Sequence, residues 1–443
     1  MSTNSCRSGH EGGNHKVLRD KWWTSRAGDC NGETGTPLGI RCDAGSMRVL
    51  FATTAGTGHF GPMMPVARAC AAAGHEVRVA APVSFAGHVE RAGLPFEPFD
   101  DVPPDVLGPI FGRLSSVSME AANRIVVGDV FGRLDAQAAL PGVSALVERW
   151  RPDVVLRDPC EFGSLAAAER AGVPHASVAI GIGALQLWAS ALLTDPLQEL
   201  DETAGLPSGT CAAAMATAPV LTSVPPSLEA TALREPSSGG APDPSVVVRF
   251  RHGDGRGGAG SLPAHWGDAD DPLVYVTFGS VTGGFPDLEV VFARCLEALA
   301  EHPVRVLLTT GHASDPEELR PWPANAHVEQ WWPQEDVMPL ASAMVGHGGF
   351  GTTMSALAAG VPQVIVPLFA SDQEINATRI AKVGAGIRLP GRQEATARVG
   401  DAVSQVLGDA HMRSVAEAIA DEIASLPDVS EIVETVQGLA RGR

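Results

Sequence analysis

The sequence predicts an α/β fold with two domains in tandem, each built on a parallel sheet that helices cover on both faces. Three observations support this prediction. The 443 residues are enough for two cores of roughly 200 residues each. Short apolar runs alternate with helical segments that stop at glycine, which is typical of parallel sheets. A stretch dense in glycine and proline interrupts the alternation once, and the alternation then starts again.

The first half alternates strands and helices from residue 48 onward. The expected strands are apolar runs, and the expected helices stop at Gly74, Gly93 and Gly172. In order, we predict strand 48–53, helix 62–73, strand 76–80, helix 84–92, strand 152–156, helix 161–171 and strand 175–180. Residues 47–235 are therefore expected to form the first domain.

The second half repeats this pattern after the break. Residues 236–272 carry the glycine and proline clusters and are expected to be an interdomain linker. The elements predicted after it are strand 273–278, helix 287–300, strand 304–309, strand 343–345, helix 353–359 and strand 363–367. Residues 273–443 are therefore expected to form the second domain, with the last helix packed back on the first.

Composition excludes several classes of protein. The formal net charge of -19 repels phosphate backbones and argues against nucleic-acid binding. The seven cysteines include no CxxC pair, so we expect reduced thiols and not a disulfide framework. The start of the chain lacks the apolar core of a signal peptide, and the apolar run 211–221 is shorter than the ~20 residues of a membrane span. These features favour a cytoplasmic protein that does not enter a membrane.

Residues 1–46 differ from the rest of the chain. They are rich in glycine, serine, asparagine and charge, and they show no hydrophobic period. They hold three cysteines and two histidines, but the spacings match no zinc pattern, so we expect no metal site. We interpret this segment as a disordered extension that ends where the first strand begins, after Met47.

The first motif, Gly-Thr-Gly-His-Phe-Gly at 56–61, follows the first expected strand. Read as G-x-G-x-x-G, it is compatible with a dinucleotide site, but the second strand ends in Ala-Ala-Pro and offers no acidic residue for a ribose. The other interpretation is that the glycines place His59 at a helix start, where a neutral imidazole can accept a proton. A histidine that only caps the turn remains an equal alternative.

The second motif is Arg-Asp-Pro at 157–159, after the strand expected at 152–156. Asp158 could cap the following helix. It could also hydrogen-bond one nitrogen of His59, fix the tautomer and stabilise the imidazolium. Both residues follow expected strands, and the carboxyl ends of parallel strands are where α/β proteins bind ligands.

The third motif, from His347 to Thr353, is the most specific. Glycines permit close backbone approach, and the amides and hydroxyls of a helix start suit a diphosphate. Ser280, after the strand 273–278, could add a further donor. The alternative is a glycine-rich turn with a capping threonine. The predicted diphosphate ligands are Ser280, His347, Gly348, Gly349, Gly351, Thr352 and Thr353.

Two further motifs complete the set. Asp372 and Gln373 open a helix after the strand 363–367; together they suit sugar hydroxyls, although an N-cap role is the alternative. The segment Trp331, Trp332, Pro333 and Gln334 offers an indole on which a flat base could stack, and ordinary core packing is the alternative. We expect the side chains of His59 and Thr353 to open onto one shared cavity.

Taken together, these motifs resemble those of family 1 glycosyltransferases of GT-B fold. The closer resemblance is to actinobacterial enzymes that decorate antibiotics and other natural products. It covers residues 47 to about 430 and rests on five motifs in the family's order. The resemblance implies two Rossmann-like domains with parallel sheets that face each other across a cleft. It implies inverting, metal-independent sugar transfer, with no cofactor besides the nucleotide-sugar co-substrate.

The resemblance also implies roles for individual residues. His59 is the general base, and Asp158 is its partner. Trp331, Trp332 and Gln334 match the base-binding segment of the family, and Asp372 and Gln373 match its sugar-binding pair. Relatives that use UDP-sugars often carry a glutamate that holds the ribose where this chain has Ser355, which favours dTDP over UDP.

In this family the acceptor binds the first domain. The matching segments here are roughly 100–140 and 181–215, and their apolar side chains suit a small hydrophobic aglycone. The apolar residues in question are Phe111, Met119, Phe131, Leu187 and Trp188. Assembly into a homodimer stays open.

Two rival functions are kept. One is a nucleotide-sugar epimerase of the same fold, which would need acid and base groups on the sugar and no acceptor pocket. The other is a non-catalytic partner that activates another transferase, which predicts a degraded base or phosphate site. Both sites are intact in this sequence.

Overall fold

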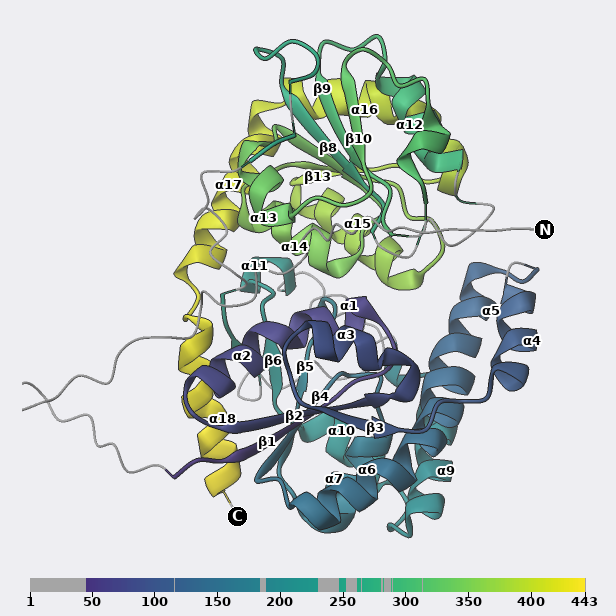
Figure 1. Ribbon diagram of the computed structural model, residues 1–443, viewed down its shortest axis with the longest axis vertical. Coiled ribbons are helices and arrows are strands. Elements are labelled where there is room, and N and C mark those ends of the chain that lie inside the picture. The colour runs from purple at the N-terminus through teal and green to yellow at the C-terminus, as the bar shows by residue number, and fades with distance from the viewer. Residues whose placement is uncertain are drawn as a thin grey trace, which may run out of the picture. The chain divides into compact units, whose positions relative to one another are not determined.

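The computed structural model of the protein describes residues 45–114, 116–183, 189–229, 247–251 and 261–442, apart from positions 264, 280, 281, 283–287, 289 and 313. Within these ranges the chain forms two parallel sheets, one of seven strands and one of six (Figure 1). This confirms the predicted α/β class.

The first sheet has the order β3-β2-β1-β4-β5-β6-β7, so β1 lies in its interior between β2 and β4. Its strands are β1 (Arg48–Ala52), β2 (Glu76–Pro82), β3 (Phe96–Phe99), β4 (Val154–Arg157), β5 (His175–Val178), β6 (Val220–Thr222) and β7 (Val247–Arg249). Every strand runs parallel to its neighbours, so all carboxyl ends lie at one edge.

The second sheet has the order β10-β9-β8-β11-β12-β13, again parallel throughout. Its strands are β8 (Leu273–Thr277), β9 (Arg305–Thr309), β10 (Ala326–Glu329), β11 (Ala343–Gly346), β12 (Gln363–Ile365) and β13 (Gly386–Arg388). The residues of β8, β9, β11 and β12 are almost all buried, as expected for strands with helices on both faces.

Helices cover both faces of the first sheet. Successive side chains of a strand point to opposite faces, so Val49 and Phe51 of β1 pack with α2 and α3, whereas Leu50 and Ala52 pack with α6, α7, α9 and α10. The helical segments of this half are α1 (Thr57–Phe60), η1 (Gly61–Met63), α2 (Met64–Ala72), η2 (Val83–Phe85), α3 (Ala86–Arg91), α4 (Pro104–Leu114), α5 (Met119–Arg124), the π-helical η3 (Ile125–Asp135), α6 (Ala136–Trp150), α7 (Gly163–Ala171), α9 (Thr194–Ala204), α10 (Thr210–Thr217) and α11 (Pro226–Glu229).

The second sheet is covered in the same way. Val274 and Val276 of β8 pack with α12 and α16, and Leu273 and Tyr275 pack toward α13. The helical segments of this half are α12 (Val290–Leu299), η6 (Pro316–Leu319), α13 (Gln334–Val337), η7 (Met338–Leu340), α14 (Phe350–Ala358), α15 (Ser371–Val383), η8 (Arg392–Arg398), α16 (Val399–Gly408), α17 (Ala410–Ser425), η9 (Val429–Glu431) and α18 (Ile432–Arg441).

The last helix, α18, belongs to the core of the first sheet and not to that of the second. Ile432, Val433 and Val436 are buried in the same cluster as Val49 and Phe51, and Gln437 approaches His75 with a nitrogen–nitrogen distance of 3.2 Å. In Figure 1 the yellow helix α18 accordingly lies against α2. The end of the chain therefore fastens onto the first sheet through apolar contacts.

Two departures from the sequence prediction have a clear physical reason. Residues 247–249, expected within the linker, form the edge strand β7, because Val248 packs against the core and Phe250 is buried in it. Residues 104–150, expected in part as variable loops, are almost continuously helical from α4 to α6. Glycines and prolines inside these helices hid their helical period.

Two simpler features complete the fold. None of the helices in the described ranges combines the length and apolar composition that a bilayer-spanning segment needs. Cys70, Cys160, Cys211 and Cys295, the cysteines within these ranges, are all free thiols.

The packing of α18 predicts a large loss of stability on Ile432→Ala. Removing this buried side chain leaves a cavity under β1 and should lower the free energy of unfolding by about 2–5 kcal/mol. Glu434→Ala, at an exposed position of the same helix, should change it by no more than about 0.5 kcal/mol. Denaturant unfolding followed by fluorescence measures both. A loss below about 1 kcal/mol for Ile432→Ala contradicts the assignment of α18 to this core.

Candidate active site

His59 lies on the short helix α1, immediately after the carboxyl end of β1. The turn is tight: the backbone amide of His59 donates to the carbonyl of Gly56 at 3.1 Å. A Cβ on Gly56 would lie 3.0 Å from the His59 ring, so the absence of a side chain lets the imidazole fold back over the turn. The imidazole remains 21% exposed, which leaves it accessible to a substrate.

Asp158 follows β4, the neighbour of β1, and faces the same edge of the sheet. Its Oδ1 lies 3.2 Å from Nδ1 of His59. The carboxylate is fully buried, and its position is fixed from other directions: Thr54 donates to Oδ2 through its amide at 2.9 Å and its hydroxyl at 3.1 Å, and the amide of Cys160 donates to Oδ1 at 2.6 Å. The predicted pair is therefore assembled in the structure.

His59 and Asp158 shift each other's pKa. Burial alone would lower the pKa of His59, but the Asp158 carboxylate and the Cys160 thiol outweigh it, and the pKa of His59 is raised well above its usual value. Burial works to raise the pKa of Asp158, yet His59 and the amides of Thr54 and Cys160 lower it below its usual value. Asp158 therefore stays ionised, and it selects the tautomer of His59 that carries its proton on Nδ1 and leaves Nε2 free.

Phe131, expected on the acceptor side, and Cys160, which the motifs did not single out, also lie beside His59. The ring of Phe131, on η3, meets the imidazole edge-on with a centroid separation of 5.3 Å. The side chains of His59, Asp158 and Cys160 place potential metal-ligating atoms within 4.8 Å of one another, the one such group found among the described residues. Sequence spacing does point to Cys160, two residues after Asp158, whereas Thr54 and the helix of Phe131 carried no recognisable signal.

In the second half, His347 follows β11 and sits in a slot made by glycines. A Cβ on Gly279 would lie 2.8 Å from the His347 ring, and one on Gly349 would lie 2.5 Å from its Nε2. Gly348, at φ +90°, takes a conformation that favours glycine. Burial lowers the pKa of His347 to about 4, and its buried Nδ1 makes no hydrogen bond within the described residues. The imidazole is therefore neutral near pH 7 and can donate one N–H.

The start of α14 adds donors beside His347. Gly349 is the N-cap and offers no side chain, and the first helical bond runs from the Thr353 amide to the Gly349 carbonyl at 3.0 Å. The amides of residues 350–352 therefore have no partner within the helix. The hydroxyl of Thr352 accepts from Nε2 of Gln334 at 3.0 Å and keeps its own proton to donate. Gly351 is exposed on the first turn.

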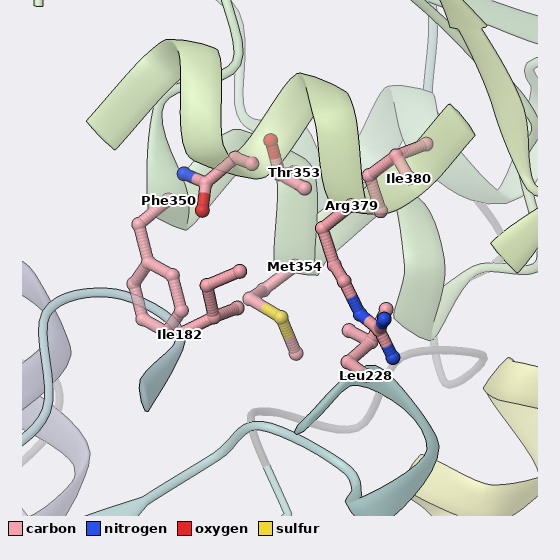
Figure 2. A pocket seen from close by; sticks show the side chains of 8 residues that line it. Ile182, Leu228, Phe350, Thr353, Met354, Arg379 and Ile380 are labelled. Carbon is pink, nitrogen blue, oxygen red and sulfur yellow. The ribbon is translucent and has the colours of Figure 1, made fainter. Parts of the chain in front are cut away.

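The side chain of Thr353, predicted as a further donor to the diphosphate, is buried and lies apart from this set. It is buried and lines a small cavity of about 10 Å³ together with Ile182, Leu228 and Met354 (Figure 2). His59 is not among the residues that line this cavity, so the cavity is not the one expected to join His59 and Thr353. The physical reason is helix phase: Thr352 and Thr353 are a third of a turn apart, and α14 packs with the face of Thr353 inward.

The two tryptophans of the Trp-Trp-Pro-Gln segment differ in their surroundings. Trp331 is 57% exposed, which leaves its ring available for a flat ligand. Trp332 packs against the core around Tyr275, and its indole N–H donates to the carbonyl of Ser261 at 2.9 Å. The structure thus gives Trp332 a packing role and leaves Trp331 as the stacking candidate.

Asp372 and Gln373 also differ in the surroundings of their side chains. The buried side chain of Gln373 uses its carbonyl oxygen to accept from the amides of Leu368 and Phe369 at 2.9 and 3.2 Å, so it shapes the loop before α15. Burial raises the pKa of Asp372, and the positive charge of His59 opposes part of the rise. Asp372 therefore lies within electrostatic range of the imidazole.

Some predicted residues cannot be placed. Ser280, Leu187 and Trp188 lie outside the described residues, as does the side chain of Met119. A larger hollow of about 350 Å³ is lined by Glu169, Pro174 and His175, at the start of β5. It opens at the edge of the sheet opposite to that of His59 and Asp158 and is not part of this site.

Sequence comparison identifies the family. The descriptions of the N-terminal and C-terminal domains of erythromycin biosynthesis protein CIII-like proteins match residues 68–234 and 293–439. The chain is 31% identical to 4'-demethylrebeccamycin synthase of Lentzea aerocolonigenes, over 88% of this chain and 99% of that protein.

Solved structures give the same result. The glycosyltransferase SnogD from Streptomyces nogalater is 26% identical, with a TM-score of 0.69 over 89% of this chain and 99% of that chain. The glycosyltransferase VinC, solved in complex with dTDP, is also 26% identical, with a TM-score of 0.67 over the same shares. Neither rival function, epimerase or non-catalytic activator, is favoured by these relatives. This chain therefore belongs to the erythromycin biosynthesis protein CIII-like family, glycosyltransferases of GT-B fold and of the antibiotic-biosynthesis type.

Proposed function

We propose that the enzyme transfers a sugar from a dTDP-sugar to a hydroxyl of a hydrophobic aglycone, with inversion, without a metal and with His59 as general base. The observation that carries this proposal is the bond between Nδ1 of His59 and the fully buried carboxylate of Asp158. An imidazole held in this way presents Nε2 as a proton acceptor, which is what deprotonation of a hydroxyl requires.

The proposed step balances as a single displacement. Nε2 of His59 takes the proton of the acceptor hydroxyl while the hydroxyl oxygen forms a bond to the anomeric carbon. The bond from that carbon to the diphosphate oxygen breaks, and the electron pair leaves with the diphosphate. Because attack and departure occur on opposite faces, the configuration inverts. Asp158 stabilises the imidazolium that forms, as the raised pKa of His59 indicates.

The groups around His347 suit the departing diphosphate. The unpaired amides at the start of α14, the Thr352 hydroxyl and the neutral imidazole of His347 are all donors, and helix N-termini favour anions. These donors meet the charge that grows on the leaving group, a role that a divalent cation fills in other enzymes. This supports transfer without a metal.

Other residues of the second half are the proposed contacts to the base and the sugar of the donor. The ring of Trp331 is exposed, so a base can stack on it. Asp372 lies within electrostatic range of His59, beside which the sugar must be held. The hydroxyl of Ser355 donates back to the carbonyl of Gly351 at 2.9 Å, so no carboxylate reaches out from this helix turn to grasp a ribose. This favours deoxyribose, and it agrees with the dTDP that VinC holds.

The acceptor side is apolar. Phe131 lies against the imidazole of His59, and Phe111 on α4 is 48% exposed although it is a large hydrophobic residue. Both belong to the helical stretch 104–150 of the first half. Such surfaces suit a flat hydrophobic aglycone, as the sequence analysis expected.

Replacement of the base gives the most direct test of the mechanism. His59→Ala should lower kcat for sugar transfer by about 10²-fold or more, since general-base catalysis contributes that much, while dTDP affinity stays within threefold. His411→Ala, at an exposed position on α17, should leave kcat unchanged. Turnover of His59→Ala within tenfold of the wild type would show that the base is another group.

The slot of His347 makes a second prediction. Gly349→Ala retains an allowed backbone, but its Cβ would lie 2.5 Å from Nε2 of His347 and must displace the ring. We expect dTDP affinity, measured by isothermal titration, to fall about tenfold or more, with the melting temperature little changed. The matched control is Gly408→Ala, whose Cβ meets no atom within 4 Å. Equal dTDP affinity in both variants contradicts the diphosphate assignment.

Nucleotide selection gives a third prediction. The wild type should bind dTDP more tightly than UDP in isothermal titration. Ser355→Glu should narrow or reverse this preference, because a carboxylate can then accept from both ribose hydroxyls. Clearly tighter UDP binding by the wild type overturns the donor assignment.

A further inference from the structure

Asp135 occupies a position beside His59 and Asp158 that neither the motifs nor the proposed mechanism uses. It is the last residue of η3, which continues without a break into α6. One turn before it, Phe131 meets the His59 ring at 5.3 Å. One turn after it, Ala139 lies against Gly163, close enough that a Cβ on Gly163 would be 2.8 Å from the Ala139 Cβ and 2.9 Å from a Glu161 oxygen. Asp135 is therefore bracketed between the catalytic imidazole and the segment that carries Asp158.

The carboxyl groups around His59 and Asp135 differ in their hydrogen-bond partners. Asp158 holds His59, Thr54 and Cys160, as described above. Glu161 accepts from the amide of Ser164 at 2.9 Å, and Asp101 accepts from the amide of Ser84, also at 2.9 Å. Asp135 is half-buried, yet it makes no hydrogen bond and no ion pair within the part of the chain that the structure describes.

The surroundings of Asp135 make the lack of a hydrogen-bond donor energetically unfavourable. Burial raises the pKa of Asp135 to about 7, the negative charges of Glu161, Asp158 and Asp101 add to the rise, and His59 opposes it. A partly desolvated carboxyl without a donor is unfavourable, and buried polar groups in native proteins normally have partners. A ligand that brings a hydrogen-bond donor satisfies this group.

We propose that Asp135 is a specificity-determining residue, which accepts a hydrogen bond from a second hydroxyl or N–H of the acceptor, next to the hydroxyl that His59 deprotonates. This inference rests on the proposed function of the site. The ligand is the acceptor and not the donor, because Asp135 lies on the acceptor-binding half and its carboxylate repels a diphosphate. The enzyme therefore selects aglycones with two neighbouring hydrogen-bond donors over those with one.

The test compares two probes that differ in one hydroxyl, 2,3-dihydroxynaphthalene and 2-naphthol. Their dissociation constants are measured by the fluorescence of the naphthols at saturating dTDP, without turnover. For the wild type at pH 8 we expect the diol to bind about tenfold or more tightly than the mono-ol, because hydrogen bonds to charged groups are strong. In Asp135→Asn this ratio should fall to within threefold.

The controls separate the possible failures. Glu148→Gln, at an exposed position near the far end of α6, should keep the wild-type ratio, and dTDP affinity should be equal in all variants. In the wild type the ratio of the two dissociation constants should also shrink at pH 6, where Asp135 is neutral. In Asp135→Asn this ratio should not change with pH. The other charged groups that face Asp135 are His59, Asp158, Glu161 and Asp101. This readout on unmodified protein holds even if a variant folds poorly.

Two results would overturn the inference: equal binding of both probes by the wild type at pH 8, or an unchanged ratio in Asp135→Asn. Because the probes are read by binding alone, these results leave the role of His59 untouched. Conversely, persistent turnover of His59→Ala would refute the base and leave the ratio of the two probes intact.

Discussion

One interaction organises the site, the hydrogen bond between His59 and Asp158. Parallel pairing of β1 with β4 brings the residues that follow these strands to one edge of the sheet. Thr54 and the amide of Cys160 then hold the buried carboxylate, so that it remains charged where burial alone would favour the neutral form. A fixed negative charge beside this partly exposed imidazole orients the ring, so that Nε2 can accept a proton. Without it, the site would hold only a histidine in a glycine turn.

The second half supplies the complementary chemistry by similar means. His347 is neutral because it is buried, and it is held tightly because glycines flank its ring. The helix α14 begins without a side-chain cap, so its first amides are also left for a ligand. Asp372 connects the halves electrostatically through its interaction with His59. In the proposed mechanism the first half accepts a proton and the second half stabilises negative charge, and sugar transfer from a diphosphate requires both.

Much of this organisation was predictable from sequence, because it follows from strand ends. The alternation of apolar runs and helices predicted both sheets. His59, Asp158 and the glycine motif each follow the end of an apolar run, and the comparisons place the chain in the family that these motifs resemble. What could not be predicted depends on packing. Thr353 turns inward while Thr352 does not, Gln373 is taken up by its own loop, and Asp135 lies on a π-helical stretch whose phase no periodicity reveals. The edge strand β7 was hidden by the glycines and prolines around it.

The pH dependence of kcat/KM tests the central interaction most directly. The base must be neutral to accept a proton, and Asp158 raises the pKa of His59, so the wild-type rate should fall as the pH drops through a midpoint well above 6.5. Asp158→Asn removes the charge; its midpoint should move to lower pH, and its plateau should fall at least about tenfold. A midpoint that stays in place or moves upward in Asp158→Asn would contradict the account, because the titrating base would then not be the partner of this carboxylate.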